Sequence, residues 1–174
     1  MQSIRKYGLL TGFSNGLWGI LSFSIVGWLN RAFFHQSIPA TDIRSVSGLF
    51  SIFILVLGIY WGIRDQKRRN GEWLSYQQAI KTGILISLIT AIIVSLFTLL
   101  YCAVLNPGYA GFMVSDAQRV LSAAGKTQEE INSRLESVRK EFSTGAQVAM
   151  AFIGQFVLGS ISSFIIGYFL RSRK

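Results

Sequence analysis

The chain has 174 residues, of which 51% are hydrophobic and only 14% charged, and its mean hydropathy is +0.43. A soluble domain carries about 25% charged residues, so the composition argues against an ordinary soluble protein. A single cysteine, Cys102, and a single histidine exclude an intrachain disulfide and a zinc-type ligand cluster, and no metal or cofactor is expected.

Four long apolar segments dominate the chain: residues 7–29, 46–63, 82–105 and 146–170. None of them contains Asp, Glu, Lys, Arg or His. Segments of about 17–25 apolar residues are typical of helices that cross the ~30 Å hydrocarbon core of a bilayer. The first is too long for a signal-peptide core and has no clear cleavage site, so we expect it to be retained. The sequence therefore predicts an all-α fold, an integral membrane four-helix bundle, as a single transmembrane domain over residues 1–174.

The charges predict the orientation of these spans. Ten basic and two acidic residues flank the ends of the spans on the side of the termini, whereas seven basic and six acidic residues lie on the other side. Basic segments stay in the cytoplasm, so an N-in/C-in arrangement is expected, with residues 64–73 as a cytoplasmic loop. The net charge of +9 then reflects membrane orientation, and no nucleic-acid partner is expected.

Small residues recur at a spacing of four in every span, which places them on one helical face. Such stripes let helix backbones approach closely within a membrane, so a tightly packed bundle is predicted. The helix-packing candidates are Gly8, Gly12, Gly16, Gly58, Gly62, Gly83, Ser87, Gly159, Ser163 and Gly167.

Asn15 and Gln155 are amide side chains well inside the spans. Intramembrane amides commonly form hydrogen bonds between helices, worth roughly 0.5–2 kcal/mol. They can also line the path of a solute. The two alternatives differ in geometry: the side chains would face one cavity, or each would face a neighbouring helix.

A second candidate site lies on the cytoplasmic side. Ser75 and Gln78 match a capping box, which predicts a helix start there. Free amides at a helix start and nearby arginines can bind phosphate. A hypothetical site for an anionic lipid or phosphate would comprise Arg64, Lys67, Arg68, Arg69, Ser75 and Lys81. The alternative is that these cations only orient the chain and attract anionic lipids without specificity.

Residues 106–144 are predicted to form an extracytoplasmic αα-hairpin between spans three and four. Pro107 ends span three, Ser115 and Gln118 are expected to open a short helix, and Gly125 closes it. Thr127 and Glu130 form a second capping box, before apolar residues on one face: Ile131, Leu135, Val138 and Phe142. The hairpin would lie on the bilayer, cover the bundle or dock a partner.

Several motifs resemble an uncharacterised bacterial family of four-span membrane proteins, domain of unknown function 4199. They are the run 58–65 (GIYWGIRD), Gly71-Glu72, the run 79–83 (AIKTG), the run 7–12 (YGLLTG) and Asn106-Pro107. The resemblance covers nearly the whole chain and implies a multi-pass protein of the bacterial inner membrane. Because the family has no established activity, it implies no catalytic residues. Its members are similar in setting to small subunits found near polyprenyl-phosphate glycosyltransferases, which implies association only.

The function expected from these observations is non-catalytic. Transport of ions usually requires ionisable residues within the spans, and glycosyl transfer usually requires paired carboxylates, a base or a metal. The leading hypothesis is an accessory or assembly subunit in envelope or lipid-linked biogenesis, with membrane lipids and a membrane-protein partner or a second copy around it. The alternative is a small transporter or channel for a neutral or lipidic solute.

Overall fold

The computed structural model describes the backbone of residues 1–33 and 40–172, and the side chains of residues 1–22, 24 and 47–172. Within this part the chain is all-helical, in the order α1 (Gln2–Phe33), α2 (Ala40–Arg69), α3 (Tyr76–Leu100), the π-helix η1 (Tyr101–Leu105), α4 (Tyr109–Ala123), α5 (Gln128–Glu141) and α6 (Thr144–Leu170). Three stretches among the described residues are long and apolar enough to cross a membrane: Ser47–Arg69, Tyr76–Leu105 and Thr144–Leu170.

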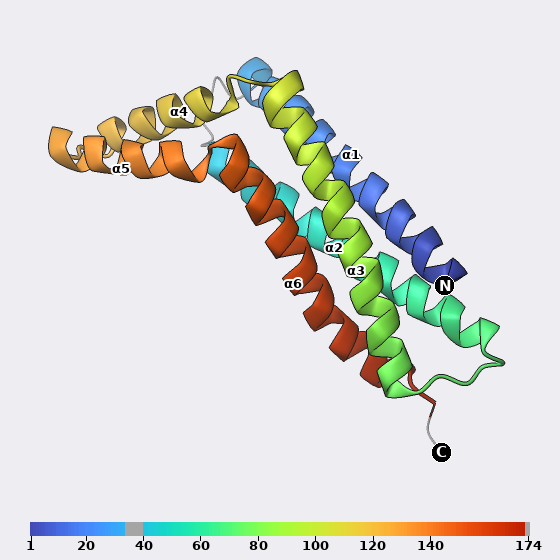
Figure 1. Cartoon of the computed structure of the whole chain (residues 1–174). Helices are drawn as coiled ribbons and strands as arrows, with labels where there is room; N and C mark the ends of the chain where they lie inside the picture. The colour runs from blue at the N-terminus through green and yellow to red at the C-terminus, as the bar shows by residue number, and fades with distance from the viewer. Residues whose placement is uncertain (34–39, 173–174) are drawn as a thin grey trace.

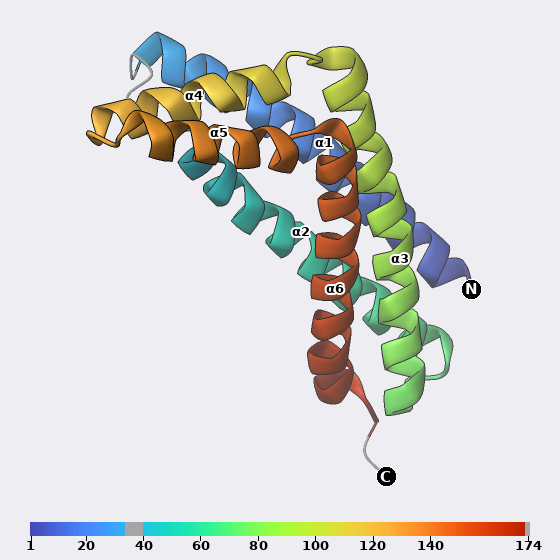
Figure 2. The same ribbon diagram turned by 60° about the vertical axis from the view of Figure 1, so that its left-hand side comes forward.

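Four long helices form the body of the molecule, and α4 and α5 project sideways from one of its ends (Figure 1). Helix α3 packs against α1, α2 and α6, and α2 also contacts α1 and α6. The start of α1, the turn between α2 and α3 and the end of α6 lie together at the opposite end, here called the terminal end. Figure 2 shows that α2 diverges from α6 towards the hairpin end.

Small residues form the contacts between these helices. Gly8, Gly12 and Gly16 of α1 face Ile89, Ile93 and Phe97 of α3, and a Cβ atom on Gly8 or Gly12 would lie 2.8 Å from the isoleucine Cβ. On α2, Gly58 faces Thr11 and Gly62 faces Ile86. Between α3 and α6, Gly83 meets Ser163, Gly159 meets Ser87 and Gly167 meets Ala79. A larger side chain at these glycines would push the backbones apart.

The serines of the α3–α6 contact satisfy their hydroxyls within their own helices. Ser87 Oγ donates to the carbonyl of Gly83 at 2.8 Å, and Ser163 Oγ donates to that of Gly159 at 2.6 Å. Next to this contact, Leu55, Ile59, Ile63 and Ile86 are fully buried. The core of the bundle therefore lies in the half nearer the terminal end.

The helices α1 and α2 extend beyond the apolar segments that defined them. Much of the stretch between the first two apolar segments is helical, since α1 ends at Phe33 and α2 begins at Ala40; residues 34–39 lie outside the described part. The prediction of a loop over 64–73 was wrong for its first half, because α2 continues to Arg69. Its last turn holds Lys67, Arg68 and Arg69, and cations there interact favourably with the helix dipole.

A tight turn then leads into α3. Gly71 and Glu72 adopt φ values of 68° and 62°, so the second residue of the turn is a non-glycine in the left-handed region. The capping box predicted at Ser75 is confirmed, with Ser75 Oγ accepting from the Gln78 amide and Gln78 Oε1 accepting from the Ser75 amide.

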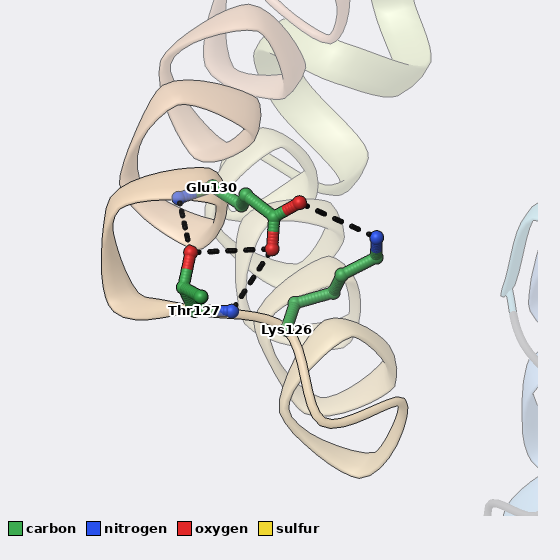
Figure 3. A network of polar contacts seen from close by, with 3 residues as sticks. All are labelled: Lys126, Thr127 and Glu130. Atoms are coloured by element: carbon green, nitrogen blue, oxygen red, sulfur yellow. Dashed lines mark hydrogen bonds and ion pairs between the residues drawn. The ribbon is translucent and has the colours of Figure 1, made fainter.

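The hairpin differs from the sequence prediction at its start. Helix α4 begins at Tyr109, not at Ser115, whose hydroxyl instead donates to the Gly111 carbonyl within the helix. Tyr109 is buried with Cys102, Met113 and Val138 in a small core that holds the hairpin to η1, and this packing favours the earlier start. The second capping box is confirmed: Thr127 and Glu130 exchange hydrogen bonds, and Lys126 pairs with Glu130 (Figure 3).

Candidate functional site

The bundle has a partly open cavity of about 340 Å³ in its hairpin half, between α1, α2, α3, η1 and α6. Its lining is mostly apolar and includes Ile20, Ile52, Val94, Phe97 and Leu158. Small-molecule sites are typically apolar cavities of ~300–1,000 Å³ with a few placed polar groups, so this cavity is at the small end of that range.

Three polar side chains from three helices meet in the cavity wall. Asn15 Nδ2 donates to Gln155 Oε1 at 3.3 Å and to the Ser51 carbonyl at 3.1 Å. Gln155 Nε2 donates to Ser51 Oγ at 2.9 Å, and Ser51 Oγ donates to Asn15 Oδ1 at 2.7 Å. These bonds form a closed ring, here called the polar triad, that links α1, α2 and α6.

The polar triad combines the two arrangements considered for Asn15 and Gln155. The two amides hydrogen-bond to each other across the bundle, and both line the same cavity. Ser51 is the member that sequence reasoning missed. Its signal was present, since Ser47 and Ser51 stand four residues apart in an apolar helix, but a lone hydroxyl is common in such helices.

One helical turn beyond the polar triad, buried residues of every helix close the bundle. Towards the terminal end, Thr11 follows Asn15, Leu55 follows Ser51 and Gly159 follows Gln155, and all three are buried. On α3, Thr90 is fully buried at the same level and donates to the Gly8 carbonyl. The cavity is therefore closed towards the terminal end.

A second class of glycine lines the cavity. Gly19, Gly48 and Gly154 come from α1, α2 and α6, and a Cβ atom on any of them would meet no described atom within 4 Å. Glycine inside a helix costs about 1 kcal/mol relative to alanine. The glycines of the packing stripes recover this cost through close helix contacts, whereas these three leave space open in the cavity.

The wall of the cavity at the hairpin end comes from η1 and the start of α6. The π-helix places Tyr101 and Cys102 in the lining, and such turns occur frequently at functional sites. Gln147 is buried there, and its Nε2 donates to the Glu141 carbonyl at 2.7 Å. Sequence reasoning gave Gln147 no role, because it lies at the first turn of an apolar segment.

The candidate phosphate-binding residues at the terminal end are directed to separate partners. Lys67 Nζ donates to the Leu170 carbonyl at the end of α6, at 3.0 Å. Arg69 pairs with Asp65 at 2.9 Å and donates to Gln2 of α1. The Arg64 guanidinium lies 5.4 Å from the centre of the Trp61 ring, Ser75 is engaged in its own cap, and Arg68 and Lys81 are exposed.

The chain after α6 also forms hydrogen bonds at the terminal end, with the turn before α3. The Ser172 amide donates to the Leu74 carbonyl at 2.9 Å, and Ser172 Oγ accepts from the Leu74 amide at 3.0 Å. Among the described residues no group of three His, Cys, Asp or Glu side chains is placed to hold a metal ion.

The comparison with protein families gives a match over residues 6–172, to the family described as "Protein of unknown function (DUF4199)". The chain belongs to this family. Comparisons with the curated proteins and with the solved structures gave no match. The DUF4199 description assigns no activity, so the case for a function depends on the cavity and its polar triad.

Proposed function

We propose that this DUF4199 protein is a four-span protein of the bacterial inner membrane, with both ends in the cytoplasm and α4 and α5 outside. Besides the three stretches named above, α1 is proposed as a span, because it has no Asp, Glu, Lys, Arg or His from Tyr7 to Leu29 and packs along α3. The basic residues near the terminal end favour the cytoplasm for that end. The family resemblance supports the bacterial location.

We further propose that the protein is not an enzyme and that it binds an uncharged, membrane-soluble molecule in its cavity. The observation that carries this proposal is the polar triad within a mostly apolar cavity. A polar group that binds there gains hydrogen bonds in a medium of low dielectric constant, while the rest of the molecule stays in apolar surroundings. This favours the solute-binding alternative over a purely structural role.

Co-purified lipid tests this function. The protein and two variants are purified in mild detergent, and bound lipids are extracted and identified by mass spectrometry. Gly154→Leu fills the cavity, while Gly145→Leu on the same helix adds the same side chain at an exposed site with open space. We expect one uncharged species to stay with the native protein and Gly145→Leu and to be lost from Gly154→Leu. An identical lipid set in all three would contradict the proposal.

A role as an accessory subunit in envelope or lipid-linked biogenesis is the second candidate. It is favoured by the hairpin, which projects from the bundle and has a groove of about 230 Å³ between α4 and α5. The groove is lined by Met113, Val120 and Val138 and bordered by Arg134 and Glu141. The proposed partner is a membrane protein, such as a polyprenyl-phosphate glycosyltransferase, or a second copy of the chain.

Affinity purification in mild detergent tests the accessory role, with Val120→Glu as the variant in the groove and Ser133→Glu as its exposed control. A partner that is lost with the first variant and kept with the second supports it. A partner kept by both variants would contradict docking at the groove.

A further inference from the structure

We infer that the cavity takes a neutral single-chain lipid whose polar group is a hydroxyl or carbonyl, seated at the polar triad with its chain leaving between α2 and α6. The inference rests on the proposed function and specifies its ligand. Four observations carry it: the absence of charge in the lining, the unused hydrogen-bonding capacity of the triad, the opening to the side, and the depth of Gln155.

The lining contains no Asp, Glu, Lys, Arg or His among the described residues. Moving an ionised phosphate or carboxylate into such surroundings without a cation would cost many kcal/mol. The basic residues lie at the other end of the bundle, where Lys67 and Arg69 already have protein partners. Phospholipid headgroups and polyprenyl phosphates are therefore excluded from the cavity.

The polar triad has room for one small polar group. Its ring uses both N–H groups of Asn15 and one N–H of Gln155. The second N–H of Gln155 is left without a partner among the described residues, and Gln155 Oε1 keeps an unused lone pair. One donor and one acceptor side by side match a hydroxyl, and the donor alone matches a carbonyl.

The cavity opens at the side of the bundle and not only at the end that faces water. Ile52 of α2 and Met150 and Leu158 of α6 line it and are themselves exposed, at 37%, 64% and 39%. Ile52 belongs to α2 and Met150 and Leu158 belong to α6, the two helices that diverge towards the hairpin end (Figure 2). In a bilayer these side chains face hydrocarbon, so a lipid chain can extend from the cavity without meeting water.

The depth of Gln155 in the proposed span favours weakly polar lipid headgroups over charged ones. Gln155 lies about 16 Å along α6 from its start at Thr144, at 1.5 Å per residue, which is about half of a ~30 Å hydrocarbon core. A charged headgroup stays at the membrane surface, whereas a hydroxyl or carbonyl can reach this depth at far lower cost. Since Thr11, Leu55 and Gly159 close the bundle below, entry is from the outer leaflet.

The test uses three probes with the same chain: 1-dodecanol, dodecane and dodecyl phosphate. Each is added at the same mole fraction to the full-length protein in nanodiscs, and the shift of the thermal unfolding midpoint is measured. The midpoint shift that each probe causes in the Gly154→Leu variant is subtracted. Because the leucine fills the cavity, that shift reports only the effect of the probe on the bilayer. Gln155→Leu is measured in parallel to remove the donor and the acceptor.

We expect dodecanol to bind roughly 10-fold more tightly than dodecane, as one hydrogen bond implies, and dodecyl phosphate to give no specific shift. Gln155→Leu should abolish the preference for the alcohol. Equal shifts from all three probes, or a larger shift from the phosphate, would overturn the inference and leave lipid binding intact. No specific shift from any probe would overturn the proposed function as well. The probe series in the native protein decides even if Gln155→Leu does not fold.

Discussion

Gly159 of α6 lies against the side chain of Ser87 of α3, where a glycine Cβ would be 2.6 Å from the serine Cβ. The reverse contact, Gly83 against Ser163, stands beside it, so each helix contributes one glycine and one serine. This exchange lets the two backbones approach more closely than any pair of larger residues would allow.

A pair of alanine substitutions in α6 separates packing glycines from cavity glycines. Gly159→Ala should destabilise the bundle by about 1–3 kcal/mol, because the added methyl group overlaps Ser87. Gly154→Ala should stabilise it by about 0.5–1 kcal/mol, because alanine has the higher helix propensity and the cavity has space. Unfolding in a denaturing detergent series measures both, and equal effects of the same sign would refute the distinction.

The glycine stripe of α1 leads to a similar expectation. Gly12→Leu should separate α1 from α3, because the leucine would occupy the place of Ile93. Leu17→Phe, at a half-exposed position of the same helix, is the control and should be tolerated. Expression and thermal stability are compared; if both variants match the native protein, the α1–α3 contact does not depend on glycine.

Cysteine labelling tests the proposed topology. In a Cys102→Ala background, single cysteines replace Asn70 in the turn before α3 and Ser133 in α5, both of which are exposed. A membrane-impermeant maleimide added to spheroplasts should label position 133 at once and position 70 only after permeabilisation. Immediate labelling of position 70, with labelling of position 133 only after permeabilisation, would show the opposite orientation.

The basic end of α2 gives a prediction about lipid specificity. Arginine binds phosphate through a planar fork that lysine lacks, so Arg64→Lys with Arg68→Lys preserves charge but removes bidentate contacts. Because Lys67, Arg69 and Ser75 already bind protein groups, we expect retention of every anionic lipid class to be unaltered in native mass spectrometry. Selective loss of one class would instead support a specific phosphate site.

The start of α5 should respond to acid. Hydrogen bonds from the Thr127 amide and hydroxyl, with help from Lys126, hold the pKa of Glu130 below its ordinary value of 4.5. The folded form therefore favours the carboxylate, and this contribution is complete above that value and is lost as the pH falls through the lower folded pKa. Amide protection factors at residues 128–131 should fall in that range, whereas Glu130→Gln should show no such step.

Local signals predicted the elements well. The capping boxes at Ser75 and Thr127 depend on side chains three residues apart, and both helices start where these residues indicate. The start of α4 was misplaced because it depends on Tyr109 packing beside Cys102 and Val138, which are close only in the folded chain.

The polar triad shows where sequence reasoning stops. Asn15 and Gln155 stood out as amides in apolar helices, but their positions are 140 residues apart. Only the arrangement of the helices determines whether such groups meet, and Ser51 completes the ring at a point that no spacing rule indicates. The cavity is likewise lined by residues of several helices, and no single helix indicates it.

The bonds of Ser87 and Ser163 to their own helices have a consequence for biogenesis. In the proposed topology, α3 would enter the bilayer during synthesis before α6 exists, so its serine face would first be covered by lipid. The Ser87 hydroxyl already binds the Gly83 carbonyl, and the Ser95 hydroxyl binds the Ala91 carbonyl. Neither serine therefore leaves an unsatisfied donor in hydrocarbon before α6 is inserted. The contact between α3 and α6 can thus form after insertion without breaking the hydrogen bonds of Ser87 or Ser163, whereas Asn15 and Gln155 find each other only when the helices assemble.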